Sequence, residues 1–405
     1  MASSTSSSPV PPLPVVITSI LSSIAEALAL IGQSPTDASI ANTRQYASIP
    51  LYNFLADFAN LSKAHATKLG LITNPPITES SHPAIARILL EIQKDVLPVV
   101  SSAPYIADRN RYGMVTHVAV CDGAKDLLKA LEEMVKGIQS NTATQITTGS
   151  GQKDKGKGRQ DINITDLREA LPSITKSPYT STGQIWHAAD KILAISQKHL
   201  IGLVESSLQN HAEMLKDCIQ EFKEWVEDAA EELKGEDSGF DEDESQSNSV
   251  HESFDDDDFF GMEGGDKTKV TKEVYAVAEA ILKKLKMTSI LYTAILKRRI
   301  RDPASGLGGI IHKKATEEGE EYSIETERNY DRLEKIEATS KLLSGEADNL
   351  AWAFYSDEGT DGITAKRETF VQTAVRLAEA CKSGGDGGED APSAWFTKFI
   401  ENINT

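Results

Sequence analysis

The sequence predicts an all-α protein made of helical bundles around one long central helix, which an acidic disordered linker follows. Between Ile201 and Leu233, two sets of residues recur every seven positions, three residues apart, as in a helix that packs lengthwise on others. This helix would be roughly 50 Å long, so helices of similar length must lie beside it. No long stretch of the chain alternates apolar and polar residues as a half-buried strand would. The seam, as we call the two sets, comprises Ile201, Leu208, Leu215, Phe222 and Ala229, with Val204, His211, Cys218 and Trp225.

Length and composition favour a folded protein of two or three domains. The chain has 405 residues, of which 40% are hydrophobic, and its net charge is −19. Residues 227–266 carry 17 acids against one lysine, which accounts for most of the excess charge. Phosphate affinity comes from lysine and arginine, so this balance argues against direct binding of nucleic acid.

Changes in composition divide the chain into four parts. We expect a disordered Ser/Pro-rich leader at 1–9, an N-terminal helical bundle at 10–233, an acidic linker at 234–266 and a C-terminal helical module at 267–405. A loop at 141–163, rich in Gly, Thr and Lys, is expected to be flexible and solvated within the first bundle.

Proline, glycine and capping residues set the helix limits within the bundles. In the N-terminal bundle we expect helices near 15–31, 51–69 and 83–98, a fourth capped by Asp108 or Asn110 and running to about 138, and short helices near 166–171 and 183–195. Pro98 should close or kink the third helix. In the C-terminal module we expect helices near 271–300, 323–355, 364–382 and 392–403, with a break at Ser344–Gly345 and a flexible acidic link at 384–390.

The N-terminus and the cysteines favour a reducing compartment. The apolar run at 13–31 lacks a preceding basic segment and contains Ser, Thr and Glu. This pattern predicts an amphipathic helix rather than a secretory signal peptide or a membrane-spanning helix. Cys121, Cys218 and Cys381 lie far apart without CxxC spacing, which disfavours disulfides and a zinc site. We therefore expect a protein of the cytoplasm and nucleus.

No motif predicts catalysis. The sequence has no HExxH, no Gly-x-Ser-x-Gly and no Cys/His nucleophile arrangement, so we expect no catalytic, cofactor-binding or metal-ligating residues. His211 lies on the seam, where a lone histidine is usually hydrogen-bonded at the edge of a bundle.

The acidic tract has several interpretations. It can be a solvated linker, a weak site for hard cations, a docking segment for a basic partner, or a target of acid-directed kinases. It can also compete for the basic face of residues 283–301, on which Lys283, Lys284, Lys286, Lys297, Arg298, Arg299 and Arg301 are expected to be exposed. The docking interpretation rests on Phe254, Asp255, Asp256, Asp257, Asp258, Phe259 and Phe260, and the kinase interpretation on Ser238, Ser249 and Ser253.

Two segments of the chain resemble the GCIP-type cyclin-D-binding protein family. The first is Gly183-Gln-Ile-Trp186, followed by a long helix with Leu215-Lys-Asp217 and Glu221 and then an acidic linker. The second is 336–355, with Ser344, Asp348, Leu350, Ala351 and Tyr355. Weaker likeness extends through 51–69 and 122–131, while the basic loop after Asn141 and the acidic tract are longer than the family pattern.

The resemblance implies an all-helical, non-enzymatic protein of cytoplasm and nucleus that contacts cell-cycle and transcription regulators, as a negative regulator of cyclin-D signalling. We accordingly predict binding of cyclin-like or helix-loop-helix proteins, with Trp186, Asp217 and Glu221 as candidate contact residues. Two alternatives stay open: a vinculin-like helical-bundle adaptor, and an acidic chaperone for basic proteins such as histones. The sequence also leaves open whether the seam is buried within the chain or by homodimerisation.

Overall fold

The structure is a computed structural model that describes residues 10–32, 49–73, 77–149, 178–237, 270–302, 307, 324–356, 358–384 and 387–405. Within these ranges the regular structure is helical and contains no strand, so the all-α prediction is confirmed. The chain forms two compact units, Met1–Leu203 and Val204–Thr405. The leader at 1–9 and the acidic residues 238–269 lie outside the described ranges.

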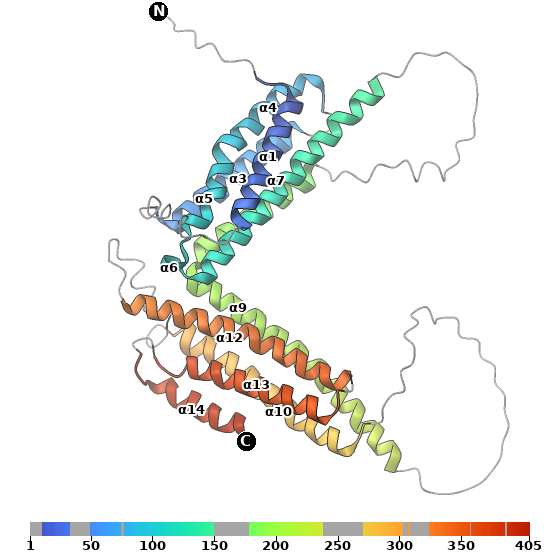
Figure 1. Ribbon diagram of the computed structural model, residues 1–405, viewed down its shortest axis with the longest axis vertical. Helices are drawn as coiled ribbons and strands as arrows, with labels where there is room; N and C mark the ends of the chain where they lie inside the picture. The colour runs from blue at the N-terminus through green and yellow to red at the C-terminus, as the bar shows by residue number, and fades with distance from the viewer. Residues whose placement is uncertain are drawn as a thin grey trace, which may run out of the picture. The chain divides into compact units, whose positions relative to one another are not determined.

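The first unit is a bundle of long helices (Figure 1). Helix α1 packs against α4, α5 and α7, and α3 packs against α4 and α5. A short 3₁₀ turn, η2 (Glu79–Ser81), precedes α4, and the first part of the long helix α9 completes the bundle. The bounds are α1 Leu13–Gly32, α3 Leu51–Ile72, α4 His82–Glu91, α5 Leu97–Ile106, α7 Met114–Gly149 and α9 Pro178–Asp237.

Helix α1 has its apolar side in the core of this bundle. Ile17, Ile20 and Ile24 are fully buried. Among the described residues, α1 is the one helix long and apolar enough to cross a membrane, judged by length and composition alone. The burial of its isoleucines agrees with the amphipathic helix expected from the sequence.

The third and fourth predicted helices differ in detail from the structure. A π-helical turn, η3 (Ile92–Val96), joins α4 to α5, so Pro98 neither ends the helix nor interrupts it: it lies in the first turn of α5, where a missing N–H is tolerated. Asp108 caps the short helix α6 (Arg109–Tyr112) by accepting a hydrogen bond from the Asn110 N–H. Gly113, with φ of 84°, ends α6, and α7 begins at the next residue.

We predicted that a loop begins at residue 141, but the structure is helical up to Gly149. Helix α7 continues to Gly149, and within it Thr142 donates its hydroxyl to the Ile138 carbonyl at 3.1 Å. Residues 150–177, with the short helix expected near 166–171, lie outside the described ranges.

Helix α9 joins two segments that we predicted as separate helices. Its first part packs between α3 and α7, where a Cβ on Gly70 would lie 2.5 Å from Thr182 Oγ1, so the absence of a side chain permits close approach. His199, with φ of 55°, is the single non-glycine with positive φ among the described residues. Its ring lies 3.9 Å from the centroid of the Tyr52 ring, which holds this irregular position against α3.

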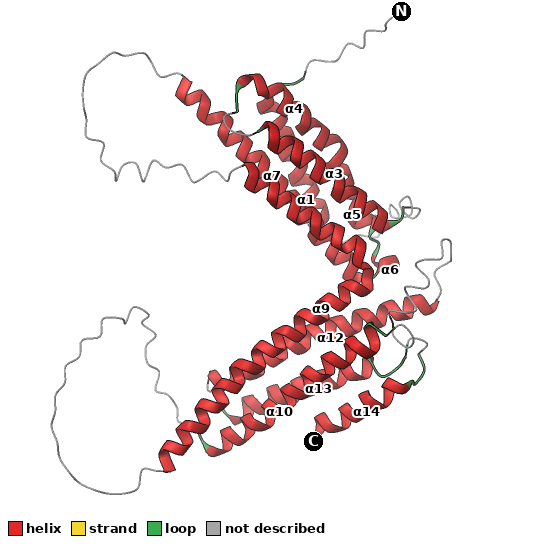
Figure 2. Cartoon of the chain, turned by 180° about the vertical axis from the view of Figure 1, so that it is seen from behind, coloured by secondary structure: helices red, strands yellow, loops and turns green. Residues whose placement is uncertain are grey.

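The second unit is formed by the rest of α9 with four further helices (Figure 2). Our predicted boundary at 233 is thus displaced to 203, because the seam of α9 from Val204 onward is buried in the second unit. Helix α9 also runs four residues into the expected linker. The bounds are α10 Lys272–Ile295, followed by the π-helical turn η4 Leu296–Ile300, α12 Ile324–Tyr355, α13 Thr360–Ala380 and α14 Ala391–Asn404.

The expected break at Ser344–Gly345 is wrong, since α12 is continuous there. Ser344 is buried, and its hydroxyl donates to the Lys341 carbonyl at 3.0 Å within the helix. Gly345 costs some helix propensity, but packing of the flanking residues outweighs that cost. Leu343 and Ala347 on either side are fully buried.

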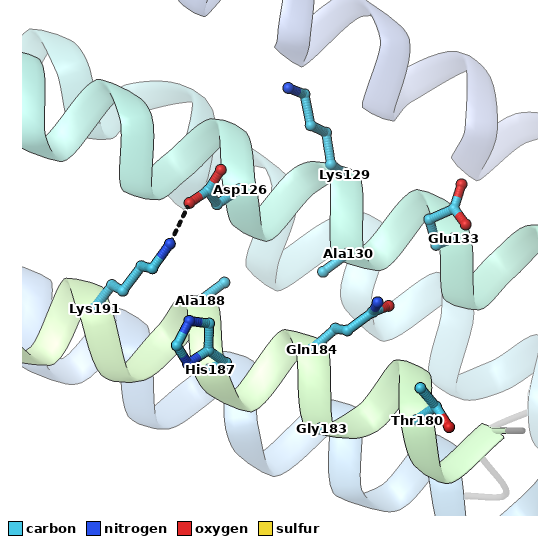
Figure 3. A pocket seen from close by; sticks show the side chains of 10 residues that line it. All are labelled: Asp126, Lys129, Ala130, Glu133, Thr180, Gly183, Gln184, His187, Ala188 and Lys191. Carbon is cyan, nitrogen blue, oxygen red and sulfur yellow. Dashed lines mark hydrogen bonds and ion pairs between the residues drawn. The ribbon is translucent and has the colours of Figure 1, made fainter. Parts of the chain in front are cut away.

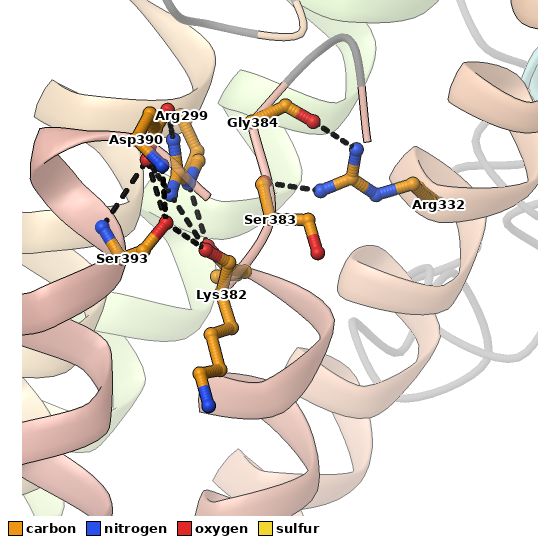
Figure 4. Close-up of polar contacts among 8 residues, drawn as sticks. Arg299, Arg332, Lys382, Ser383, Gly384, Asp390 and Ser393 are labelled. Carbon is orange, nitrogen blue, oxygen red and sulfur yellow. Dashed lines mark hydrogen bonds and ion pairs between the residues drawn. The ribbon is translucent and has the colours of Figure 1, made fainter. Parts of the chain in front are cut away.

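Arg299 is fully buried, which corrects its expected place on an exposed basic face (Figure 4). Its guanidinium donates to both Asp390 carboxylate oxygens at 2.5 and 2.8 Å, and to the carbonyls of Cys381 at 2.6 Å and Lys382 at 3.1 Å. Such a forked pair with further acceptors compensates the cost of burying the charge. The basic cluster is therefore in part structural.

The link between α13 and α14 is held from both sides. Arg332 donates to the carbonyls of Ser383 and Gly384, and Asp390 caps α14 in a capping box with Ser393. The two ends of the link expected at 384–390 are thus held by hydrogen bonds, at the Gly384 carbonyl and at the Asp390 cap.

We predict that Phe222→Ala lowers the free energy of unfolding of the second unit by about 3 to 5 kcal/mol, because Phe222 is fully buried on the seam. Denaturant unfolding followed by tryptophan fluorescence measures this, since Trp225, Trp352 and Trp395 all belong to that unit. Lys216→Ala, an exposed position on the same helix, is the control and should change stability by less than about 0.5 kcal/mol. Equal effects of the two variants would contradict burial of the seam.

We predict that acid weakens the second unit through Asp390. Hydrogen bonds from Arg299 lower the pKa of its carboxyl from 3.8 to about 2. The resulting stabilisation is present above pH 3.8 and is lost as the pH falls through about 2. Arg299→Met should remove this pH dependence and also destabilise the unit by about 3 kcal/mol or more at pH 7, since it leaves the buried partners unpaired.

The neighbouring Arg301 gives the matched control. It pairs with Glu205 at 2.6 Å, and 47% of its side chain is exposed. Arg301→Met should cost less than about 1 kcal/mol. Denaturation midpoints between pH 2 and pH 5 would refute this account if both arginine variants kept the pH profile of the unchanged chain.

Candidate interaction surface

Polar contacts fix the register between the second part of α9 and α12. Ser207 donates from its hydroxyl to the Glu337 carboxylate at 2.9 Å. The two ring nitrogens of His211 lie 3.2 Å from Ser207 Oγ and 3.3 Å from Ser344 Oγ. Burial lowers the pKa of His211, and so favours the neutral ring. The expectation that His211 is hydrogen-bonded within the bundle is confirmed.

Two helical turns further along α9, Cys218 contacts Asp348 of α12 across the same interface. The thiol hydrogen-bonds to the carboxylate, and burial raises the pKa of Cys218 to about 12. Desolvation also raises the pKa of Asp348. The segments 215–221 and 344–355, which carry the family resemblance, therefore contact each other. The sequence pattern alone did not show that they are partners.

An aromatic cluster ends this interface. Phe222, Trp225 and Phe354 contact one another, with Phe222 and Trp225 stacked at 5.9 Å and Phe222 and Phe354 tilted at 5.0 Å between ring centroids. Tyr355 lies 6.4 Å from both Trp225 and Trp352. Phe222 and Phe354 are buried in this cluster, and Trp225, Trp352 and Tyr355 form its outer layer.

The outer layer of the cluster is largely open to solvent. Trp352 is 62% exposed and Tyr355 is 40% exposed, while Trp225 is half-buried. We call Trp225, Trp352 and Tyr355 the aromatic surface. Tryptophan and tyrosine are the side chains that most often dominate binding energy at protein interfaces, so an exposed group of three is a candidate docking site.

Acidic side chains of α9 border the aromatic surface. Asp217, Glu221 and Glu224 are exposed. The pKa of Tyr355 is raised to about 12, first by burial and then by nearby charges that include Glu221 and Glu224. The carboxylates of Glu221 and Glu224 thus lie close enough to Tyr355 to raise the pKa of its hydroxyl. Of the predicted contact residues, Glu221 belongs to the border of this surface, while Asp217 is exposed one turn earlier on α9.

Trp186, the third predicted contact residue, belongs to the first unit. Its indole N–H donates to Thr67 Oγ1 at 3.2 Å, and Lys63 Nζ lies 6.0 Å from the ring centroid. Lys63 also pairs with Asp190. Trp186 is 45% exposed, and the hydrogen bond of its indole N–H connects α9 to α3, so this side chain has a structural role.

A groove lies between α7 and the first part of α9 (Figure 3). It encloses about 500 Å³ and includes Asp126 and Lys191, which pair at 2.9 Å across it. Gln184 Oε1 is buried without a partner in the described part of the chain. The resemblance included Gly183 and Gln184 and, more weakly, residues 122–131 of α7, but it did not show that these segments form one groove. The remaining lining residues are Lys129, Ala130, Glu133, Thr180, His187 and Ala188.

The groove mixes charges of both signs and lacks a nucleophile paired with a base. Among the described residues, no group of three His, Cys, Asp or Glu is placed to hold a metal ion. The three cysteines are buried and free. The candidate docking segment 254–260 and the candidate phosphorylation sites Ser238, Ser249 and Ser253 lie outside the described ranges.

Comparison with known proteins finds two fungal relatives. An uncharacterized protein of Schizosaccharomyces pombe is 22% identical over 360 residues, covering 86% of this chain and 83% of its own length. An uncharacterized protein of Saccharomyces cerevisiae is 21% identical over 286 residues, covering 70% and 71%. No protein-family model matches the chain. No solved structure matches it. The similarity to both relatives spans more than one unit of the fold.

Proposed function

We propose that this chain is a non-enzymatic protein-binding protein that uses the aromatic surface of its second unit. The observation that carries the proposal is the exposure of Trp352 at 62% beside Tyr355 and Trp225. Leaving large aromatic rings in water is unfavourable, and burying Trp352 under a partner would release about as much free energy as burying a core side chain.

The border of carboxylates defines the partner chemistry. Glu221 and Glu224 place negative charge on the α9 side of the aromatic rings. A complementary partner presents an amphipathic helix with an apolar stripe flanked by lysine or arginine. Helix-loop-helix regulators carry such helices next to a basic region.

The resemblance to the GCIP-type family supports the same class of partner. Its two segments meet at α9 and α12 and end at the aromatic surface. We therefore propose regulation of the cell cycle or transcription, in cytoplasm and nucleus, through binding of helix-loop-helix or cyclin-like proteins.

A titration with a purified helix-loop-helix domain and with a purified D-type cyclin tests this function. Trp352→Ala should weaken binding about 10-fold or more, because a central aromatic contact is lost. Leu342→Ala is the matched control: it is on the same helix, 47% exposed and outside the aromatic surface, and should change affinity less than about 2-fold.

Salt and charge give a second readout. Glu221→Gln with Glu224→Gln should reduce both the affinity and its dependence on ionic strength. If neither probe binds the intact chain, the proposed partner class is wrong. Salt-sensitive binding of histones, or co-sedimentation with actin filaments, would then favour the acidic chaperone or the vinculin-like adaptor.

A further inference from the structure

An apolar groove lies between α10 and α14 in the second unit. It encloses about 600 Å³, and its apolar walls are Met287 and Ile290 from α10 with Trp395 and Phe399 from α14. Ile290 is 59% exposed on one wall of this groove. Lys398, Asn402 and Thr405 complete the lining. The groove is separate from the aromatic surface, which α9 and α12 form.

Positive charges surround this groove. Lys283 and Lys286 are exposed and lie four residues before Met287 and Ile290, so they occupy the same side of α10 one turn away. The Arg298 guanidinium lies 5.4 Å from the centroid of the Trp395 ring. Within the described ranges, no carboxylate lies within 4 Å of the ammonium groups of Lys283, Lys286 or Lys398. The same two helices also expose acids: Glu279, four residues before Lys283 on α10, and Glu401 on α14.

Apolar walls with a cationic border are complementary to a segment of aromatic and acidic residues. The chain contains such a segment, Phe254–Phe260. It has four consecutive aspartates, with one phenylalanine before them and two phenylalanines after them. This segment would be repelled by the aromatic surface, whose border is acidic, but attracted by Lys283, Lys286, Arg298 and Lys398.

The connection to α10 is long enough for the segment to reach the groove. From Lys272 to Ile290 the helix rises about 27 Å. The 12 residues from Phe260 to Lys272 span up to about 40 Å when extended. A tether of this length gives an effective concentration on the order of millimolar, so even a weak contact would be substantially occupied.

We propose that the groove between α10 and α14 binds the segment Phe254–Phe260 of the same chain. The phenylalanine rings contact Ile290, Met287 and Trp395, and the aspartates pair with the surrounding lysines and Arg298. The acidic tract is then an internal ligand of the second unit. This proposal concerns a different surface from the proposed partner site, so the test of one does not depend on the outcome of the other.

Thiol labelling of the full-length chain tests the contact. Ile290→Cys places an exposed thiol in the groove, while the native cysteines are buried, with the pKa of Cys218 and of Cys381 raised to about 12. Adding Phe254→Ala, Phe259→Ala and Phe260→Ala should speed labelling of the new thiol at least 3-fold. Leu342→Cys, exposed on α12, should label at the same rate with and without the triple change.

A peptide of residues 250–264 provides the second measurement. The triple phenylalanine variant of the full chain should bind it at least 10-fold more tightly than the unchanged chain, whose own segment competes. Replacing the four aspartates of the peptide by asparagine should weaken binding, as should Ile290→Asp in the chain. Leu342→Asp should not.

Equal labelling rates with and without the phenylalanines would overturn the proposal, as would equal peptide affinity of the triple variant and the unchanged chain. If Ile290→Asp instead converts a dimer to a monomer in sedimentation, the groove is an interface between two copies and the proposal is also wrong.

Discussion

Burial of the seam of α9 is the constraint on which the second unit depends. Leu208, Leu215 and Phe222 are each at most 1% exposed, and they are covered within a single chain. A helix that carries such a stripe cannot stand alone, because an uncovered row of leucine and phenylalanine costs several kcal/mol. Helix α12 covers it through Ser344, Asp348 and Phe354. The position of the aromatic surface follows directly, since it is where this interface reaches solvent.

Buried charge imposes a second constraint at the other end of the unit. Arg299 draws together η4, the end of α13 and the cap of α14 with one guanidinium. The surrounding basic residues then have different roles: Arg301 pairs with Glu205, and Lys284 donates to the Ile403 carbonyl, while Arg298 lies against Trp395. A row of positive charges in the sequence thus separates into structural cations and cations that face the α10–α14 groove.

The hydrophobic periodicity of the sequence was sufficient to predict the helices, but it did not show that α9 contributes to both units. The seam and the proline at the start of α14 follow from local rules, and Asp108 is a cap as expected, although of the short helix α6. The break expected at Gly345 and the loop expected from Asn141 were wrong, because burial of Leu343 and Ala347 and continuation of α7 override weak local propensity. Arg299 was misplaced since its acceptors are carbonyls more than 80 residues away. The aromatic surface required the pairing of α9 with α12, which no local pattern contains.

The sharing of α9 between two units determines how the chain can be divided. A fragment that begins at the acidic tract would lack Val204, Leu208, Leu215 and Phe222, and would leave the partner face of α12 in water. A fragment that ends at 233 would carry the same stripe uncovered. Recombinant halves of this protein are therefore best separated next to His199, where the helical geometry is already interrupted. Limited proteolysis within residues 238–269, by contrast, would leave both halves of the second unit's core associated, because α9 and α12 stay joined by their packing and not by that peptide link.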